Sequence, residues 1–268
     1  MIKVTKDVNA VPLSLMPAYL DLFLGRARVP IKSRNTHEKR MLVINAQAYN
    51  DTAAFNDRYK EDEIKRALIE LYKSKCAFCE QRVEQYHIEH YRPKKIYYWL
   101  AFSWDNLILS CPTCNQNKGI NFRLQGVQVT FNNVESNIRT INVSSAGYDI
   151  IELPDMVNPE VTDPLGRIEF DSNGSINSVD SRFDYTIRTC KIDRKDLNDN
   201  RRHLLKIFKD HIRAALYEHT DPQEQKIAVN TVIRNFIIDS KNTHLEFLAF
   251  RRYAINTDWL SDIIKELN

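Results

Sequence analysis

The sequence predicts an α+β fold: a small core held together by a bound metal ion, helices before and after it, and a short β region. Three observations predict this fold. Apolar residues repeat with helical spacing at 64–72 and 204–216, which is typical of amphipathic helices. Runs such as VQVTF and IRTINV, within 124–150, alternate apolar and polar residues as strands do. Two CxxC pairs, at 76–79 and 111–114, are typical of a metal site.

Length and composition set the outer limits. The chain has 268 residues, enough for one large domain or two smaller ones, and its 43% hydrophobic content is typical of a soluble globular protein. A net charge of +3 permits an anionic partner without requiring one. No apolar run approaches the roughly 20 residues of a membrane helix, and the start resembles no signal peptide. We therefore expect a cytoplasmic protein without a membrane partner.

The elements are expected in a definite order. Residues 1–35, with three prolines, predict an extended arm, followed by a helix over 36–48. The helix at 64–72 should end just before Cys76. RIEF-DSNG-SINSV predicts a hairpin that turns at Asn173-Gly174. From about residue 182 the pattern is helical, with one long helix through 204–216 and two or three more after it.

This order divides the chain into four parts. They are an N-terminal arm with helices (1–75), a core (76–122), a β-rich region (123–180) and a helical C-terminal region (181–268).

The cysteines give the strongest signal. Cys76, Cys79, Cys111 and Cys114 form two knuckles that can close a tetrahedral zinc shell. Such a shell has no open position for water, so this Zn²⁺ should be structural. The alternative, two unrelated redox or buried pairs, lacks the strand-to-helix context of thioredoxin-like motifs. Cys190 lies on an apolar helical face and is expected in the core.

The segment between the knuckles resembles a known unit. VEQYHIEHYRPK and FSWDNLILSCPTCNQNKG predict a strand, a loop, a second strand and a helix. With zinc at its base, this arrangement resembles the ββα-metal unit of the HNH endonucleases in their four-cysteine form. The matching residues are Glu89-His90, Asn106-Leu107 and Asn115. The residues of these two segments resemble one branch still more closely, the PtuB HNH subunits of Septu and retron-associated antiphage systems.

The resemblance implies a role for each matching residue. His90 would be the general base, since a neutral imidazole can take a proton at neutral pH. Glu89 and Asn115 would hold a catalytic Mg²⁺ or Mn²⁺ through their oxygens. Asn106 would bond the backbone and hold the His90 loop in place. The chain departs from the commonest pattern with Glu89, where Asp is usual, and Asn115, where His is usual. The Asn variant occurs in the family and favours Mg²⁺ over softer metals.

Basic and aromatic residues follow the first strand. Beside a metal and a base, clustered cations are expected to contact phosphates, although such a run elsewhere would be a solvated face. The residues concerned are Arg92, Lys94, Lys95 and Lys118. Tyr97, Tyr98 and Trp99 could stack on unpaired bases. We favour the alternative, in which they pack a helix onto the zinc unit.

Two further polar residues have open roles. His87 shares a strand face with Glu89 and is either an additional ligand or a partly exposed strand histidine, which we favour. Asp105 is either a metal ligand or, as we favour, part of a turn.

Together these features predict a metal-dependent endonuclease that cleaves nucleic acid, with DNA as the favoured substrate. It would act as the effector of an antiphage system. The resemblance implies a PtuA-like ATPase subunit as partner, and a retron RNA–DNA as a further one. The helices past 200 and FLAFRRY at 247–253 would form the partner surface, or else belong to the core. The alternatives are an RNA nuclease, for example of tRNA, and an inactive zinc module that only binds nucleic acid.

Overall fold

The computed structural model describes residues 1–19 and 29–267, and its mixture of helices and short strands confirms the α+β class. The helices are α1 (Ile31–Ala46), α2 (Ala53–Tyr59), α3 (Asp62–Tyr72), α4 (Pro112–Lys118), α5 (Glu135–Arg139), α6 (Asp149–Glu152), α7 (Ser181–Thr189), α8 (Lys195–Tyr217), α9 (Pro222–Lys241), α10 (Leu248–Asn256) and α11 (Trp259–Leu267). The strands are β1 (His87–His90), β2 (Leu107–Ser110), β3 (Glu169–Phe170) and β4 (Ile176–Asn177).

A two-stranded sheet and a helix form the predicted ββα unit. β1 and β2 are antiparallel, with His87 opposite Ser110 and His90 opposite Leu107. All four residues of β2 are buried, because α3 packs against this strand. α4 follows β2 after one residue and packs against β1. The short linker fixes the start of α4 at the end of the sheet.

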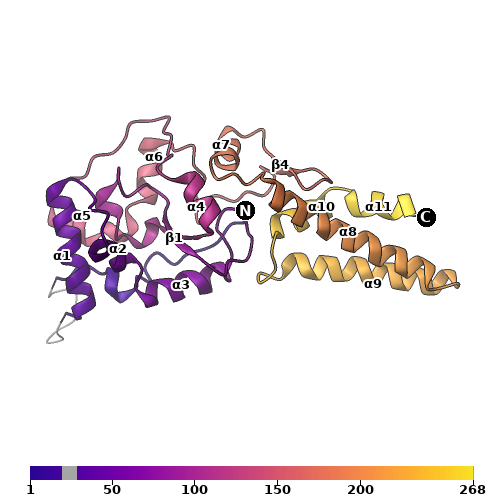
Figure 1. The fold of residues 1–268 in the computed structure, drawn as a ribbon. Helices are drawn as coiled ribbons and strands as arrows, with labels where there is room; N and C mark the ends of the chain where they lie inside the picture. The colour runs from indigo at the N-terminus through magenta and orange to yellow at the C-terminus, as the bar shows by residue number, and fades with distance from the viewer. Residues whose placement is uncertain (20–28, 268) are drawn as a thin grey trace.

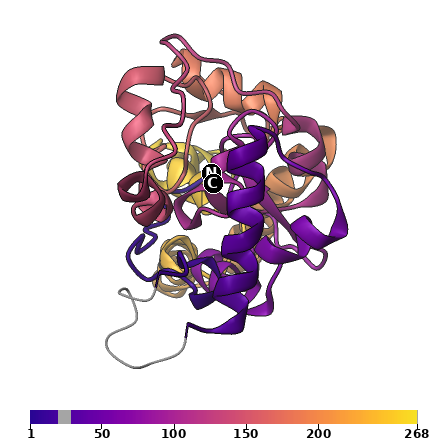
Figure 2. The ribbon, with the colours of Figure 1, turned by 90° about the vertical axis from the view of Figure 1, so that its left-hand side faces the viewer.

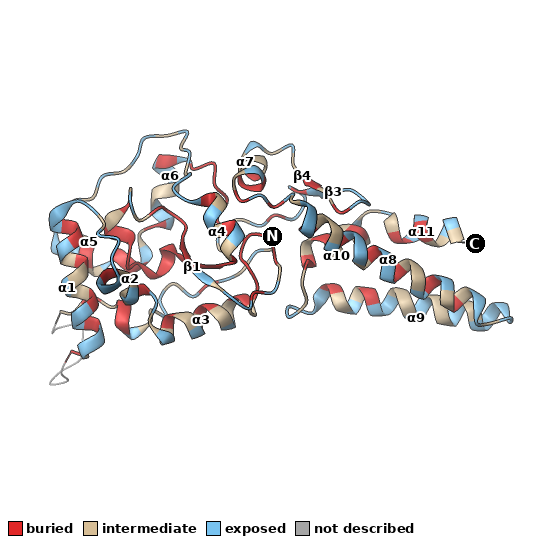
Figure 3. Ribbon diagram, viewed as in Figure 1, coloured by how far each residue is buried: buried red, intermediate tan, exposed pale blue. Residues whose placement is uncertain are grey.

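The C-terminal helices extend from the rest of the molecule. α8 and α9 lie side by side, and α10 and α11 pack against them (Figure 1). Viewed from the end that carries α1, these helices lie behind the remainder of the fold (Figure 2). The outer part of the α8–α9 pair is mostly exposed (Figure 3). One buried apolar cluster nevertheless includes residues from all four predicted parts, such as Leu68, Leu109, Phe170 and Phe208. The division into four parts stays a prediction.

The N-terminal helices are only partly as predicted. α3 ends at Tyr72, so the prediction of a helix that stops just before Cys76 is confirmed. The predicted arm is too long, because α1 begins at Ile31, directly after Pro30. Proline fixes its own φ and is tolerated at the start of a helix, so Pro30 marks a beginning rather than a continuing arm. Residues 20–28 of the arm lie outside the described residues. Helix α2 was not predicted.

The prediction of strands within 124–150 is wrong. The described residues there form α5, the start of α6 and short 3₁₀ turns, and Leu124 makes only an isolated bridge with Pro154. In IRTINV the two buried isoleucines are Ile138 and Ile141, three apart as on a helix, and Asn142 is buried too. VQVTF has no strand beside it, and Val127 is 76% exposed. Alternation without a pairing partner therefore misled the prediction.

The predicted hairpin is confirmed. β3 and β4 pair antiparallel, and the Gly174 N–H donates to the Asp171 carbonyl at 2.8 Å. Gly174 has a φ of +89°. An added Cβ there would lie 2.0 Å from the Asn198 carbonyl oxygen on α8. Glycine is therefore required both by the turn and by its close approach to α8.

Gly174→Ala should destabilise the protein. An alanine at positive φ that also meets the backbone of α8 should lower the free energy of unfolding by about 1–3 kcal/mol. Urea unfolding followed by circular dichroism measures the change. Gly147→Ala is the matched control, because an added Cβ meets nothing within 4 Å there. Equal stability of the two variants would contradict the prediction.

Candidate active site and metal centre

Four buried cysteines meet where the two knuckles converge. The Sγ atoms of Cys76, Cys79, Cys111 and Cys114 all lie within 4.8 Å of one another. Cys111 is the N-cap of α4, and its sulfur accepts the Cys114 N–H at 3.4 Å. Four thiolates this close repel one another unless a cation lies among them. The cluster therefore fits a tetrahedral structural metal site, for which zinc is the usual ion.

An arginine from the C-terminal region contacts this cluster. The Arg194 guanidinium lies 3.6 Å from the Cys114 sulfur and 3.9 Å from the Cys79 sulfur. A tetrathiolate zinc site carries two net negative charges, which a guanidinium offsets. Arg194 is the N-cap residue of α8, so it joins the metal centre to the C-terminal helices.

The predicted ligands of the catalytic metal lie together. The Asn115 amide, on α4, donates to Glu89 Oε2, on β1. Lys118, one turn further along α4, donates to Glu89 Oε1 at 2.7 Å and to the His90 carbonyl at 2.8 Å. Burial raises the pKa of Glu89, and Lys118 opposes that rise. The carboxylate is thus held between α4 and the sheet.

His90 is buried and held by its neighbours. Its Nε2 lies 2.9 Å from the Ala101 carbonyl oxygen, which can only accept, so Nε2 carries the proton and Nδ1 the lone pair. The Tyr59 ring stands edge-on to the imidazole, with the centroids 4.6 Å apart. Burial, followed by the charge of Lys94, lowers the pKa of His90 to about 3. The imidazole is therefore neutral at neutral pH.

The Asn106 side chain forms hydrogen bonds with the backbone of the loop that orients His90. Its amide donates to the Arg92 carbonyl at 3.0 Å and to the Leu100 carbonyl at 3.2 Å. Its oxygen accepts the Arg92 N–H at 2.8 Å. Leu100 precedes Ala101, whose carbonyl contacts His90. These contacts have the form expected from the resemblance; their catalytic value stays a prediction.

Two of the four predicted phosphate contacts are turned inward. Arg92 is fully buried, and Glu152, Asp149 and Ser145 accept from its guanidinium. Lys118 is fully buried against Glu89. Because carboxylates distant in sequence pair with the Arg92 and Lys118 side chains, neither side chain offers its charge to a phosphate in this structure. Lys95 is exposed and Lys94 is partly exposed, so for these two the prediction stands untested.

The remaining polar residues have surroundings that agree with the interpretations we favoured. His87 is exposed. Asp105 accepts from the Ser103 hydroxyl and the Ser145 N–H, as a turn residue does.

Tyr97 and Trp99 belong to a buried apolar cluster that also includes Ile44 of α1, Ile138 and Ile141. The four cysteines belong to a different cluster, so the packing of the aromatic run onto the zinc unit stays a prediction. Cys190 is buried in the core, as predicted.

Residues 76–120 match the model of the HNH endonuclease family. The chain is also 30% identical over 179 residues to the Septu protein PtuB of Bacillus mycoides, covering 60% of this chain and 56% of that protein. It is 31% identical over 101 residues to the Septu protein PtuB of Bacillus thuringiensis, covering 35% of this chain and 39% of that one. These matches confirm the resemblance found in the sequence. The chain spans about half or less of the length of these curated relatives.

Two contacts of the HNH site were missed by sequence reasoning. Tyr59 lies on α2, outside the matched segment, and its spacing from Phe55 indicates only a buried helix face. Arg194 lies 80 residues from Cys114 along the chain, and nothing local points to the cluster. No sequence signal links either residue to the site.

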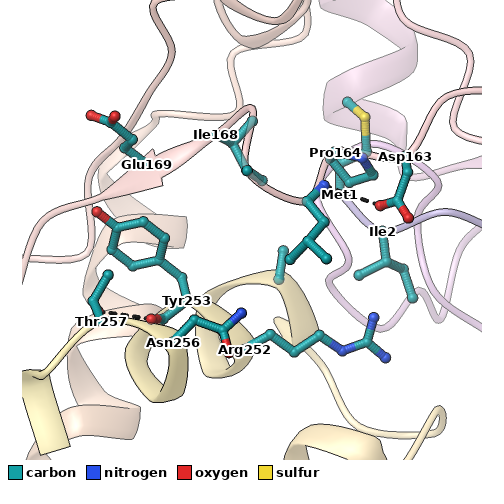
Figure 4. Close-up of a pocket in the computed structure, with 13 residues that line it drawn as sticks. Met1, Ile2, Asp163, Pro164, Ile168, Glu169, Arg252, Tyr253, Asn256 and Thr257 are labelled. Carbon is teal, nitrogen blue, oxygen red and sulfur yellow. Dashed lines mark hydrogen bonds between the residues drawn. The ribbon is translucent and has the colours of Figure 1, made fainter.

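Other features of the molecule lie apart from this site. A cavity of about 370 Å³ is enclosed by the N-terminal residues, the loop 163–169 and α10 (Figure 4). Its lining residues, which include Ile168 and Tyr253, contain none of the predicted site residues. Within the described residues, no helix has both the length and the apolar character needed to cross a membrane.

The purified protein should contain one zinc per chain, with Zn–S distances of about 2.3 Å. Cys111→Ser should lower the zinc content and the thermal stability together, because the same sulfur binds the metal and caps α4. Elemental analysis and thermal unfolding measure the two effects. Cys190→Ala is the control, since it removes a buried thiol that is not one of the four clustered sulfurs and should leave the zinc content unchanged. The absence of zinc, or a Cys76–Cys79 disulfide in protein purified under reducing conditions, would rule the site out.

Proposed function

We propose that this protein is a metal-dependent endonuclease that hydrolyses phosphodiester bonds, with DNA as the favoured substrate. One observation carries the proposal: in the segment that matches the HNH family, a neutral histidine with a fixed tautomer directly follows a glutamate whose carboxylate contacts an asparagine amide of α4. The match over residues 76–120 supports nuclease activity in general.

Glu89 and Asn115 fit a divalent ion by the chemistry of their donors. Their side chains are in direct contact. Turning the Asn115 amide, whose two ends have nearly the same shape, would bring its oxygen to the carboxylate side as a second hard donor. When bound there, Mg²⁺ or Mn²⁺ would polarise the phosphate and stabilise the leaving oxygen. Lys118 already offsets part of the Glu89 charge, so ion binding should be weak until a phosphate supplies further oxygens.

The chain's own residues would do the rest of the chemistry. His90 Nδ1 would take a proton from the attacking water, while the Ala101 carbonyl keeps Nε2 protonated. Asn106 would keep that carbonyl in position through Leu100. The Tyr59 ring would shield one side of the imidazole from bulk water, which favours its neutral form.

A general base that activates water does not require a 2′-hydroxyl on the substrate. RNA, for example a tRNA, therefore remains the second candidate substrate. An inactive binding module is disfavoured, because such a module would not require an oriented neutral histidine together with a paired carboxylate and amide.

The PtuB relatives support a role in a defence system. We propose that the chain acts as the effector of an antiphage complex with an ATPase subunit. In the segment FLAFRRY, Phe247, Leu248 and Phe250 are buried in the core, and the other four residues are partly exposed, so its role as a docking surface stays a prediction. A retron RNA–DNA partner and a cytoplasmic location stay predictions from the sequence.

His90→Ala should lower the cleavage rate by at least about 10²-fold, the usual cost of losing a general base. Cleavage of duplex DNA, single-stranded DNA and total RNA with Mg²⁺, with and without the ATPase, measures the rate. Zinc content and circular dichroism should not change. His203→Ala, which removes an exposed histidine of α8, is the control. Parental activity in His90→Ala would mean that another residue is the base.

EDTA should stop cleavage while the zinc remains bound, because tetrathiolate zinc is held far more tightly than an ion with two protein ligands. Adding Mg²⁺ or Mn²⁺ should restore the activity. The measurement is a cleavage assay with parallel elemental analysis and circular dichroism. Undiminished cleavage in EDTA with zinc intact would exclude a Glu89–Asn115 ion from the mechanism.

A further inference from the structure

The ammonium group of Lys94 lies in a cage built by residues that precede the HNH segment. Lys94 Nζ donates to Asn56 Oδ1 and to the Tyr59 hydroxyl, each at 2.9 Å, and to Asp51 Oδ1 at 3.2 Å. It also lies over the Tyr49 ring, 4.4 Å from the centroid, and near the Tyr59 ring at 4.9 Å. Three acceptors and two aromatic rings thus surround one cation.

The cage is itself held by hydrogen bonds. Asn56 Oδ1 accepts from the Tyr49 hydroxyl at 2.8 Å and from the Tyr59 hydroxyl at 3.1 Å. The Asn56 amide donates to Asp51 at 2.9 Å. These contacts fix both tyrosines and the asparagine before any ligand arrives. Lys94 therefore has one preferred position.

That position is beside the catalytic histidine. Tyr59 contacts the Lys94 ammonium with its hydroxyl and the His90 ring with its own ring. One side chain of α2 thus spans the cation and the general base. The matched segment begins at Cys76, so α2 and the turn before it are outside it.

Asp51 differs from the other members of the cage. Among the described residues its carboxylate forms the ion pair with Lys94, and its side chain is 49% exposed, whereas that of Lys94 is 17% exposed. An ion pair with so exposed a partner contributes little stability. A phosphate oxygen offers the same charge and the same kind of acceptor as the Asp51 carboxylate. A phosphate can therefore replace Asp51 at small cost. Asn56 then loses its hydrogen bond to Asp51, but Asn56 and Tyr59 keep their contacts with Lys94.

We propose that Tyr49, Asn56 and Tyr59 position Lys94 beside His90 to bind a substrate phosphate, and that Asp51 occupies the place of that phosphate in the free protein. This proposal rests on the proposed nuclease function. It makes the N-terminal helical part a wall of the active site, with Tyr59 as a positioning residue and Lys94 as the group that touches substrate.

Binding measurements test the proposal without cleavage. Fluorescein-labelled duplex DNA is titrated with the full-length protein in EDTA at several salt concentrations. Lys94→Met should reduce the slope of log K against log salt by about 1, the loss of one phosphate contact. An unchanged slope, with wild-type protein that binds and cleaves, would overturn the cage proposal alone. Wild-type protein that binds but never cleaves with Mg²⁺ would refute the nuclease function instead, and one that does neither would refute both.

Asp51→Asn should tighten DNA binding by about two- to fivefold, the range expected for an exposed ion pair, because the isosteric amide no longer competes with phosphate. Asp62→Asn is the matched control: it removes the same charge from an exposed position on α3 and should change binding less. Equal effects of the two substitutions would show a general charge effect and contradict a specific place for Asp51.

A double-mutant cycle tests the positioning role of Tyr59. Tyr59→Phe keeps the ring beside His90 and removes only the hydroxyl that holds Lys94. It should weaken binding in the parent but not in Lys94→Met, since the cation it positions is then absent. The same loss in both backgrounds would mean that Tyr59 acts only through the fold, and the positioning role would be wrong.

Discussion

The convergence of four thiolates is the constraint on which the rest of the site depends. Cys111 directly follows β2 and caps α4, so metal binding at this sulfur sets where α4 begins and thereby brings Asn115 and Lys118 to Glu89. The other knuckle follows α3. Four charged sulfurs cannot be buried together without a cation, so metal binding and local folding are one process. Arg194 extends this coupling to α8.

The predictions that depended on spacing along the chain largely hold. A CxxC pair places two sulfurs close together wherever it occurs. Likewise, two antiparallel strands and a helix with short links leave little freedom for Glu89 and Asn115. The contacts of Asn106 follow from its place at the start of β2. For such features the sequence alone was sufficient, because each relation is fixed within one ββα unit.

The features that sequence reasoning did not foresee involve partners distant in sequence. Arg92 follows β1 closely, and nothing near it indicates that Glu152 and Asp149 will enclose it. A buried charge must be paired, and the partner is supplied by tertiary structure. The strands expected in 124–150 failed for a related reason, since an alternating segment becomes a strand only where another strand pairs with it. Tyr59 could not be found from α2 alone.

These long-range contacts show that the HNH segment does not build its site alone. His90 donates a hydrogen bond to the loop before β2 and contacts the Tyr59 ring of α2. The Tyr59 hydroxyl in turn accepts from Lys94, which α2 and its preceding turn hold in place. A neutral, oriented base needs shelter from water, and a short two-stranded sheet has too little surface to provide it. The shelter comes from the N-terminal helices, which also hold Lys94, the residue for which we propose a phosphate contact. Substrate preference should therefore depend on residues outside the segment that defines the family.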